Sequence, residues 1–138
     1  MDGKTVLVAD DEPHIRHMLD YKLRKTGFSV VTAGNGREAF ELARKHRPDV
    51  IVTDYQMPVC NGMEFAIRLK SEPDTAAIPV LLLTSRGHKV PASELAKTNV
   101  KALMPKPFSP RELTAQIEEL IATRRAAPDD FEGGAAAA

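Results

Sequence analysis

Cysteine is almost absent from this sequence, which contains only Cys60 and can therefore form no disulfide within the chain. Tryptophan is absent and aromatic residues make up 5% of the chain, so aliphatic side chains must supply most of the core. The apolar runs are far shorter than the roughly 20 residues that a membrane-spanning helix needs. The N-terminus lacks the basic and then apolar profile of a signal peptide, and we expect a cytoplasmic protein without a membrane segment.

Net charge is also lacking, because 19 basic residues balance 19 acidic ones. The charges are unevenly placed: residues 126–138 hold three acidic residues and no basic one, which leaves residues 1–125 with a small positive surplus. So small a surplus gives no argument for binding to nucleic acid. The length fits one domain. The change of composition after Arg125 predicts a domain over residues 1–125 and a disordered acidic, glycine- and alanine-rich tail over residues 126–138.

Five short apolar runs, separated by amphipathic stretches, predict five β-strands. Their apolar residues are continuous and do not alternate with polar ones, which suits strands that are buried on both faces of a parallel sheet. The fourth run has Pro79 near its start, where the missing N–H is tolerated. The runs cover residues 6–9, 28–31, 50–52, 78–83 and 100–104.

The stretches between these runs have helical spacing and recognisable starts. Asn35 and Asn61 are each followed three residues later by glutamate, which is typical of a helix N-cap. Ser109 precedes the last helix, whereas the fourth helix has only Ser93 as a polar cap candidate. Alternating strands and helices predict an α/β fold: a doubly wound, flavodoxin-like three-layer sandwich of a five-stranded parallel sheet with five flanking helices.

Polar residues follow the predicted strands where each one ends. Asp10 and Asp11 follow the first strand, Asp54 the third, Thr84 the fourth and Lys106 the fifth. In a doubly wound fold these ends meet at one edge of the sheet. Neighbouring carboxylates repel and raise each other's pKa values, and Mg²⁺, which takes oxygen ligands, relieves that repulsion. The set also suits phosphoryl transfer onto an aspartate, with the lysine and the hydroxyl holding the phosphoryl oxygens.

Four motifs at these strand ends resemble one family. The segments VLVADDE, DVIVTDYQMPVCNGMEF, LLLTS and PKPF are similar to the receiver domain of two-component response regulators, in order and in spacing. The resemblance runs through residues 4–122 and leaves only the tail uncovered. It implies a chemotaxis-regulator-like receiver in its single-domain form, with a five-stranded parallel sheet and five helices.

The resemblance implies a role for each carboxylate. Asp54 would be the phosphoacceptor, which takes the phosphoryl group from the phosphohistidine of a sensor histidine kinase or a phosphotransfer protein. Asp11 and Asp54 would bind the cofactor Mg²⁺ directly, together with the backbone carbonyl of Gln56. Asp10 would act mainly through a bound water.

The resemblance also implies roles for two residues that contact the phosphoryl group. Thr84 would move toward it after transfer, and Lys106 would pair with it. In this family the bond between Lys106 and Pro107 is cis. The protein would then be a signalling switch that catalyses only its own phosphorylation and dephosphorylation, not a metabolic enzyme.

The partners implied are proteins. Phosphorylation would switch a surface formed by the fourth helix, the fifth strand and the fifth helix, where an unidentified downstream protein binds. No nucleic acid or membrane is expected, and the chain would be a monomer or a weak, phosphorylation-dependent dimer.

The sequence departs from the family pattern at several positions. Leu103 stands where members often carry the tyrosine or phenylalanine that swings inward on activation. Cys60 and Asn61 fill the places often taken by methionine and aspartate after the phosphoacceptor. Gln56 and Arg86 occupy positions that tune dephosphorylation in the family, and their effect on the phosphoryl lifetime does not follow from the sequence.

Three alternatives remain at this point. Asp10, Asp11 and Glu12 could simply favour the N-terminus of a helix. A phosphatase of the haloacid dehalogenase type also uses aspartate, threonine, lysine and Mg²⁺, although Asp10 and Glu12 only approximate its Asp-x-Asp motif and the chain leaves no room for a cap domain. A non-catalytic interaction module that does not switch is favoured by Leu103 and disfavoured by the intact acidic set.

Overall fold

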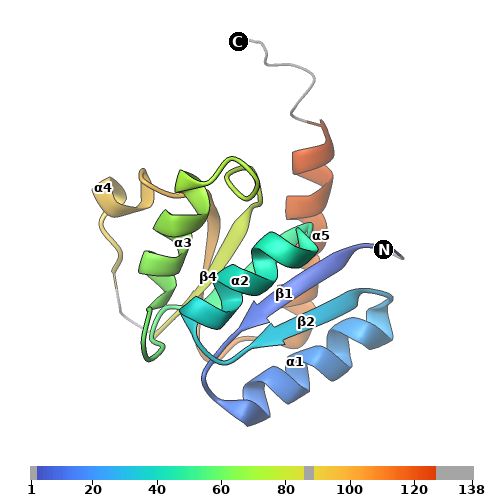
Figure 1. The fold of residues 1–138 in the computed structure, drawn as a ribbon. Helices are drawn as coiled ribbons and strands as arrows, with labels where there is room; N and C mark the ends of the chain where they lie inside the picture. Colours follow the sequence, from blue (N-terminus) through green and yellow to red (C-terminus); the bar gives the residue numbers. More distant parts are fainter. Residues whose placement is uncertain (1–2, 86–88, 127–138) are drawn as a thin grey trace.

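The structure, a computed structural model, describes residues 3–85 and 89–126 and shows strands and helices alternating along the chain (Figure 1). The predicted residues of the tail beyond Ala126, and Arg86, lie outside the described residues. The elements are β1 Thr5–Ala9, α1 Pro13–Thr26, β2 Ser29–Ala33, α2 Gly36–His46, β3 Val50–Asp54, α3 Gly62–Ser71, β4 Val80–Thr84, α4 Ala92–Leu95, β5 Val100–Pro105 and α5 Pro110–Ala126.

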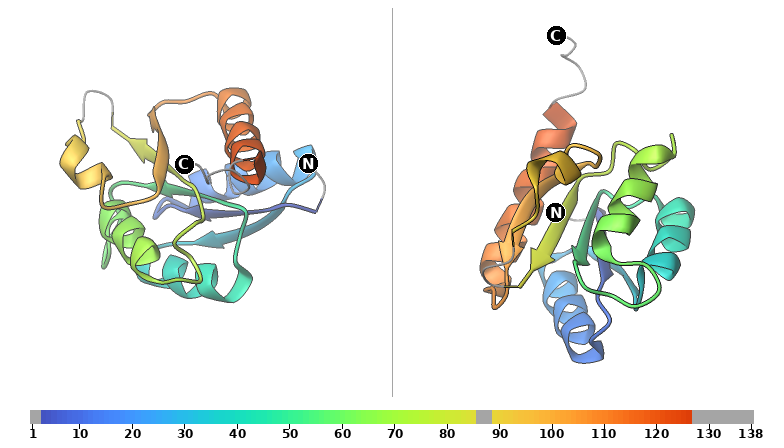
Figure 2. Two further views of the ribbon diagram at one scale, coloured as in Figure 1. Left: turned by 90° about the horizontal axis from the view of Figure 1, so that it is seen from above. Right: turned by 90° about the vertical axis from the view of Figure 1, so that its left-hand side faces the viewer.

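The five strands form one parallel sheet in the order β2-β1-β3-β4-β5. In the left view of Figure 2, α5 lies on one side of the sheet and α2 and α3 lie on the other. The predicted doubly wound sandwich is therefore confirmed. Within the described residues, no helix has both the length and the apolar composition that a membrane crossing needs.

The core has two halves, one on each face of the sheet. Val8, Val52 and Leu83 point to the face that α1 and α5 cover, where they meet Leu19 and Ile117. Alternate residues of the same strands point to the other face, under α2 and α3. The members of that half include Leu7, Ile51, Phe40, Phe65 and Leu69. Because both faces are covered, β1, β3 and β4 are apolar almost throughout, as the continuous runs predicted.

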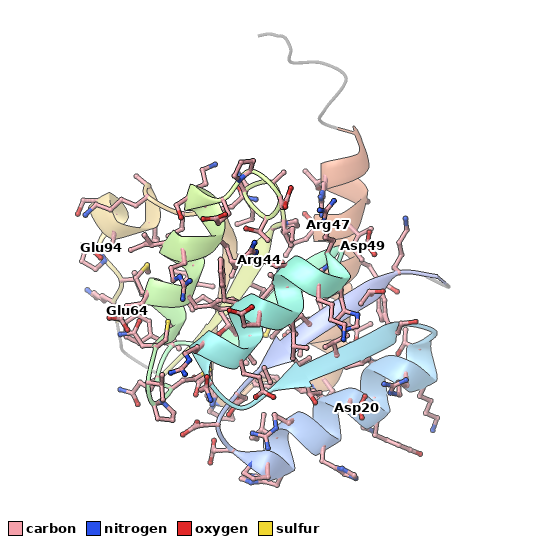
Figure 3. The ribbon with its side chains drawn as sticks, in the orientation of Figure 1. Asp20, Arg44, Arg47, Asp49, Glu64 and Glu94 are labelled. Atoms are coloured by element: carbon pink, nitrogen blue, oxygen red, sulfur yellow. The ribbon has the colours of Figure 1, made fainter. Side chains whose placement is uncertain are left out.

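Three predicted helix caps are present and one is wrong. The side chains of Asn35 and Asn61 accept hydrogen bonds from backbone N–H groups of α2 and α3, and Asn61 completes a reciprocal capping box with Glu64, which lies at the start of α3 in Figure 3. The Ser109 hydroxyl accepts from the first turn of α5. Ser93, in contrast, lies inside α4, whose N-cap is Pro91.

The fourth and fifth units are less regular than the others. α4 is a single turn with no buried residue, at the outer margin of the molecule (Figure 1). The register between β4 and β5 shifts at Lys101, so that β5 contains one extra residue. Leu103 belongs to β5, at the edge of the sheet, and is 46% exposed. The predicted output surface therefore contains an exposed leucine beside a very short helix.

Candidate functional site

Three carboxylates converge where β1 and β3 end. The side chains of Asp10, Asp11 and Asp54 each offer an oxygen, and these oxygens lie within 4.8 Å of one another. Asp10 and Asp54 are buried, whereas Asp11 is exposed. Parallel pairing explains the meeting, because β1 and β3 are neighbours in register and end at the same edge of the sheet.

Lys106 reaches this group from the loop after β5. Its Nζ lies 3.4 Å from an Oδ of Asp10, 3.4 Å from an Oδ of Asp54 and 3.6 Å from an Oε of Glu12. The lysine side chain is 26% exposed, so the ammonium is partly shielded from water. The structure thus brings Lys106 to Asp54, as predicted, and adds Glu12 as a further partner.

The electrostatics of the site follow from this burial. Burial raises the pKa of the Asp54 carboxyl above its ordinary value of 3.8; the Asp10 charge raises it further, and Lys106 only partly offsets both. Burial lowers the pKa of the Lys106 ammonium, but the charges of Asp10 and Asp54 outweigh burial and leave that pKa raised. Asp54 is therefore a carboxylate that is short of positive charge.

This shortage predicts a stability effect with a defined pH dependence. Asp54→Asn is expected to raise the free energy of unfolding in chelator-treated buffer, because the amide removes a charge that the folded state disfavours. Because the pKa of Asp54 is raised in the folded protein, its ionised carboxyl destabilises the fold at pH values above the folded-state pKa and has no such effect below the ordinary value of 3.8. The stabilisation by Asp54→Asn is therefore expected at pH 7 and absent at pH 3. Urea unfolding at both pH values measures it; equal gains at both would contradict the charge explanation.

Thr84 ends β4 beside the lysine. It is 5% exposed, and its backbone carbonyl accepts a 2.7 Å hydrogen bond from the Lys106 N–H. The Thr84 hydroxyl makes no hydrogen bond to any other residue in the described part of the chain. The bond between Lys106 and Pro107 is cis, as the resemblance implies. Thr84 ends β4, which pairs with β3, the strand that ends at Asp54.

The start of α1 does not use the acidic residues as a cap. Glu12 is the N-cap residue of this helix and its side chain makes no capping hydrogen bond. Asp10 accepts from the Glu12 N–H at 2.9 Å, before the helix begins. The Arg16 guanidinium binds the Asp10 carbonyl at 2.7 Å and fixes this loop, a contact that sequence reasoning missed. The interpretation of the acidic residues as a simple N-cap cluster is therefore not supported.

A glycine allows the loop after Asp54 to fold back on the strand. The Gly62 N–H donates to the Tyr55 carbonyl at 2.8 Å, and a Cβ at position 62 would lie 2.2 Å from the Asp54 carbonyl oxygen. Gly36, at the start of α2, faces the same loop, and a Cβ there would lie 2.3 Å from the Cys60 carbonyl oxygen. The two glycines therefore let α2 and α3 approach the loop that carries the site.

An open hollow of about 510 Å³ adjoins the acidic group. Its walls come from the end of β1 and from the loop between β3 and α3. They include Gln56, the residue whose carbonyl is the predicted third metal ligand. The lining residues are Asp11, Tyr55, Gln56, Met57, Pro58 and Asn61.

Val59, at the tip of this loop, is strained. Its φ of 71° lies in the left-handed region, where a β-branched residue is an outlier, and its side chain is 72% exposed. Val59→Gly is expected to raise the free energy of unfolding by about 1 kcal/mol. Glycine relieves the backbone strain, and the greater flexibility that it gives to the unfolded chain offsets part of this gain. Urea unfolding measures it, with Val59→Ala, which keeps a Cβ, as the control. A loss of stability in the glycine variant would contradict the strain.

The residues of the site fit a hard divalent cation. Four carboxylates, those of Asp10, Asp11, Glu12 and Asp54, face one ammonium, that of Lys106, so the group lacks positive charge. All the side-chain donors are oxygens, the ligands that Mg²⁺ prefers. The hollow beside them leaves space for the waters that Mg²⁺ retains.

Comparison with known proteins gives a consistent picture. The family model of the response regulator receiver domain matches residues 6–118. The chain is 36% identical over 132 residues to the phosphate regulon transcriptional regulatory protein PhoB of Pseudomonas aeruginosa, covering 96% of this chain and 57% of the relative. It is 34% identical to the alkaline phosphatase synthesis transcriptional regulatory protein PhoP of Bacillus subtilis, covering 86% of this chain and 49% of the relative. The chain thus spans about half the length of these relatives.

Solved structures share the fold. The chemotaxis protein CheY4 of Vibrio cholerae is 34% identical with a TM-score of 0.77, over 85% of this chain and 98% of the other. A response regulator receiver domain protein of Clostridium thermocellum is 27% identical with a TM-score of 0.80, over 88% of this chain and 97% of the other. Both similarities extend over nearly the whole of the matched chain, so they concern the complete sheet and its helices.

Proposed function

This chain belongs to the response regulator receiver domain family, and on that premise we propose that Asp54 accepts a phosphoryl group from a phosphohistidine and thereby switches a binding surface. Response regulators of two-component systems are phosphorylated on aspartate with Mg²⁺, and the chain carries the matching residues. The observation that supports the proposal most directly is Asp54 itself, a buried carboxylate at the end of β3 with Lys106 3.4 Å away and two more carboxylates beside it.

The transfer requires Asp54 in its ionised form. An Oδ of Asp54 attacks phosphorus, the P–O bond forms as the P–N bond of the phosphohistidine breaks, and the electron pair of that bond returns to the imidazole, which takes up a proton. Lys106 holds the attacking carboxylate and balances charge on the phosphoryl oxygens. Thr84, whose hydroxyl has no other partner among the described residues, donates a hydrogen bond to one of those oxygens.

The cation would be held by Asp11, Asp54 and the Gln56 carbonyl, with Asp10 acting through a water. When bound, Mg²⁺ supplies positive charge that offsets the phosphoryl oxygens and the clustered carboxylates. Two contacts support the indirect role proposed for Asp10: one of its oxygens accepts the Glu12 N–H and the other faces Lys106.

The output would lie on the surface of α4, β5 and α5. Asp54 gains negative charge on phosphorylation, and this charge attracts the side chains of Thr84 and Lys106. Thr84 is the last residue of β4 and Lys106 follows β5, so the change extends to both strands. Leu103, exposed on β5, repacks in place of the family's usual aromatic ring. The partner would be a protein whose affinity differs between the two states, and equal affinity with and without the phosphoryl mimic beryllofluoride would contradict this part.

Intact-mass spectrometry after incubation with acetyl phosphate tests the proposal. We expect a gain of one phosphoryl group that requires Mg²⁺ and is lost in Asp54→Asn. Asp20→Asn is the matched control, because Asp20 lies on α1 in an exposed ion pair with Arg24 (Figure 3) and should leave the gain unchanged.

Three outcomes separate the alternatives. No adduct and no released phosphate, with Mg²⁺ bound, would indicate an interaction module that does not switch. Sustained release of phosphate from a phosphate monoester would indicate the phosphatase. An adduct that persists in Asp54→Asn would place the phosphoryl group elsewhere and overturn the assignment of Asp54.

A further inference from the structure

A second concave region lies at the end of the sheet opposite to Asp54. It is a groove of about 820 Å³ between the last turns of α5 and the segments that lead into β4 and β5. α5 runs toward this end of the molecule, away from the arrowheads of β1 and β4 (Figure 1). The residues that line it are Lys70, Ala76, Ala77, Pro79, Asn99, Lys101, Gln116, Glu119, Leu120, Thr123 and Arg124.

The groove has an apolar floor and a basic rim. Pro79 and Leu120 are buried at its base. Lys70 and Lys101 are exposed on the rim, and neither makes an ion pair with any other described residue. Arg124 contributes a third positive charge, against the single negative charge of Glu119. The groove therefore suits an acidic segment that carries one apolar side chain.

Arg124 also fixes the far end of the groove. Its guanidinium donates to the Asp49 carbonyl at 3.2 Å, and Asp49, which precedes β3 in the sequence, lies close to α5 in Figure 3. The Asp49 side chain in turn accepts from the Thr5 N–H at 2.8 Å. These bonds hold the end of α5 against the sheet, so the groove wall is anchored at its last turns.

We propose that residues 128–132 of this chain, Pro-Asp-Asp-Phe-Glu, bind in this groove. They are separated from the end of α5 by one residue, Ala127, and supply three negative charges and one aromatic ring. Asp129, Asp130 and Glu132 would face the basic rim, and Phe131 would cover the apolar floor. The proposal replaces, for these five residues, the expectation of a disordered tail.

Residues 128–132 are long enough to run back along α5 into the groove. The part of α5 that lines the groove, residues 116–124, is about 12 Å long at 1.5 Å per residue. Five extended residues span up to about 17 Å, enough to follow it backward. Pro128 favours a break at this point, because proline disfavours helical conformation in the residue before it. The segment thus has the reach, the charge and the apolar side chain that the groove requires.

The proposal is independent of phosphoryl transfer. β5 carries Lys101 near its first residue and leads to Lys106 at its other end, so the groove and Asp54 lie at opposite ends of the parallel sheet. A bound tail would leave the acidic site open. It would cover the start of β5 and the last turns of α5 instead.

NMR of the full-length chain tests the proposal. We expect amide order parameters of about 0.8 for residues 129–132, near those of the domain, where a free tail falls below about 0.6. We also expect nuclear Overhauser contacts between the Phe131 ring and the Leu120 methyl groups. Free-tail order parameters or an absence of those contacts would overturn the proposal.

Variants test whether the charges of the groove and the Phe131 ring hold the tail in place. Lys70→Glu combined with Lys101→Glu is expected to release the tail and lower its order parameters, and Phe131→Ala is expected to do the same. Lys45→Glu, an exposed lysine of α2 outside the groove, is the matched control and should change nothing. If isotope-filtered spectra of a labelled and unlabelled mixture place the contacts between two chains, the groove binds a second copy and the intrachain proposal fails.

Discussion

Gly62→Ala is expected to lower the free energy of unfolding by at least about 2 kcal/mol and to slow phosphorylation of Asp54 more than tenfold. The new methyl group would lie 2.2 Å from the Asp54 carbonyl oxygen and 3.0 Å from the Tyr55 Cα. Both neighbours are backbone atoms, so no side-chain rotation relieves the clash. Alanine favours a helix over glycine by about 1 kcal/mol, which is too little to offset the clash. Either α3 or the end of β3 must move, and both position the phosphoacceptor.

Gly34→Ala is the matched control for this prediction. A Cβ at position 34 meets only side-chain ends, the nearest being the Arg16 nitrogen at 3.2 Å that also bonds the Asp10 carbonyl, and a small shift of that side chain relieves the contact without moving the backbone. We expect a change within about 0.5 kcal/mol, as for most surface substitutions. Urea unfolding gives the stability and mass spectrometry with acetyl phosphate gives the rate. A Gly62→Ala protein as stable as the Gly34→Ala protein would show that the close approach is not required.

Lys106→Met is expected to destabilise the protein by about 1–3 kcal/mol at pH 7 in the absence of divalent cations, and added Mg²⁺ should restore part of the loss. Removing one member of a buried ion pair costs about 3–5 kcal/mol, and the range is reduced here because the lysine side chain is 26% exposed. The physical cause is the group of carboxylates, with Asp10 fully buried, that would be left without a cation.

The pH dependence identifies that cause. The pKa of Lys106 is raised in the folded protein, so its contribution is complete below the ordinary value of 10.5 and is lost as the pH rises through the folded-state pKa. At acid pH the carboxyl groups become protonated and the cost of Lys106→Met should shrink. Lys45→Met is the control at an exposed site. A loss of stability that is constant between pH 3 and pH 8, or that Mg²⁺ leaves unchanged, would indicate lost packing instead of lost charge.

The fold could be predicted largely because its strands are buried on both faces. Continuous apolar runs identified β1, β3 and β4, and the fourth began two residues too early because Ile78 precedes the ladder. The Ile78 carbonyl instead accepts from the Asn99 side chain at 2.9 Å, a contact across 21 residues that no local pattern contains. The prediction of Ser93 as a cap was wrong because α4 is a single turn without a buried residue, so packing added little to the local preference.

The candidate site could be predicted as a set, but not its surroundings. Asp10 and Lys106 each follow a strand, Asp54 is the last residue of one, and the parallel topology brings them together. The Arg16 contact to the Asp10 carbonyl depends on how α1 is placed, and the strain at Val59 depends on the path of its loop. No local sequence pattern indicates either feature. At position 59, for example, the residue with positive φ is a valine and not the glycine that would have predicted it.

The irregular fifth strand has a consequence for self-association. β5 lies at one edge of the sheet, and a free strand edge is where another chain can add a strand and begin an aggregate. The extra residue at Lys101 breaks the register there, and Pro105 offers no N–H, so an incoming strand would find an interrupted ladder on the free side of β5. Leu103, exposed between these two breaks, can therefore serve as a contact for partner side chains with little risk of fibril-like stacking.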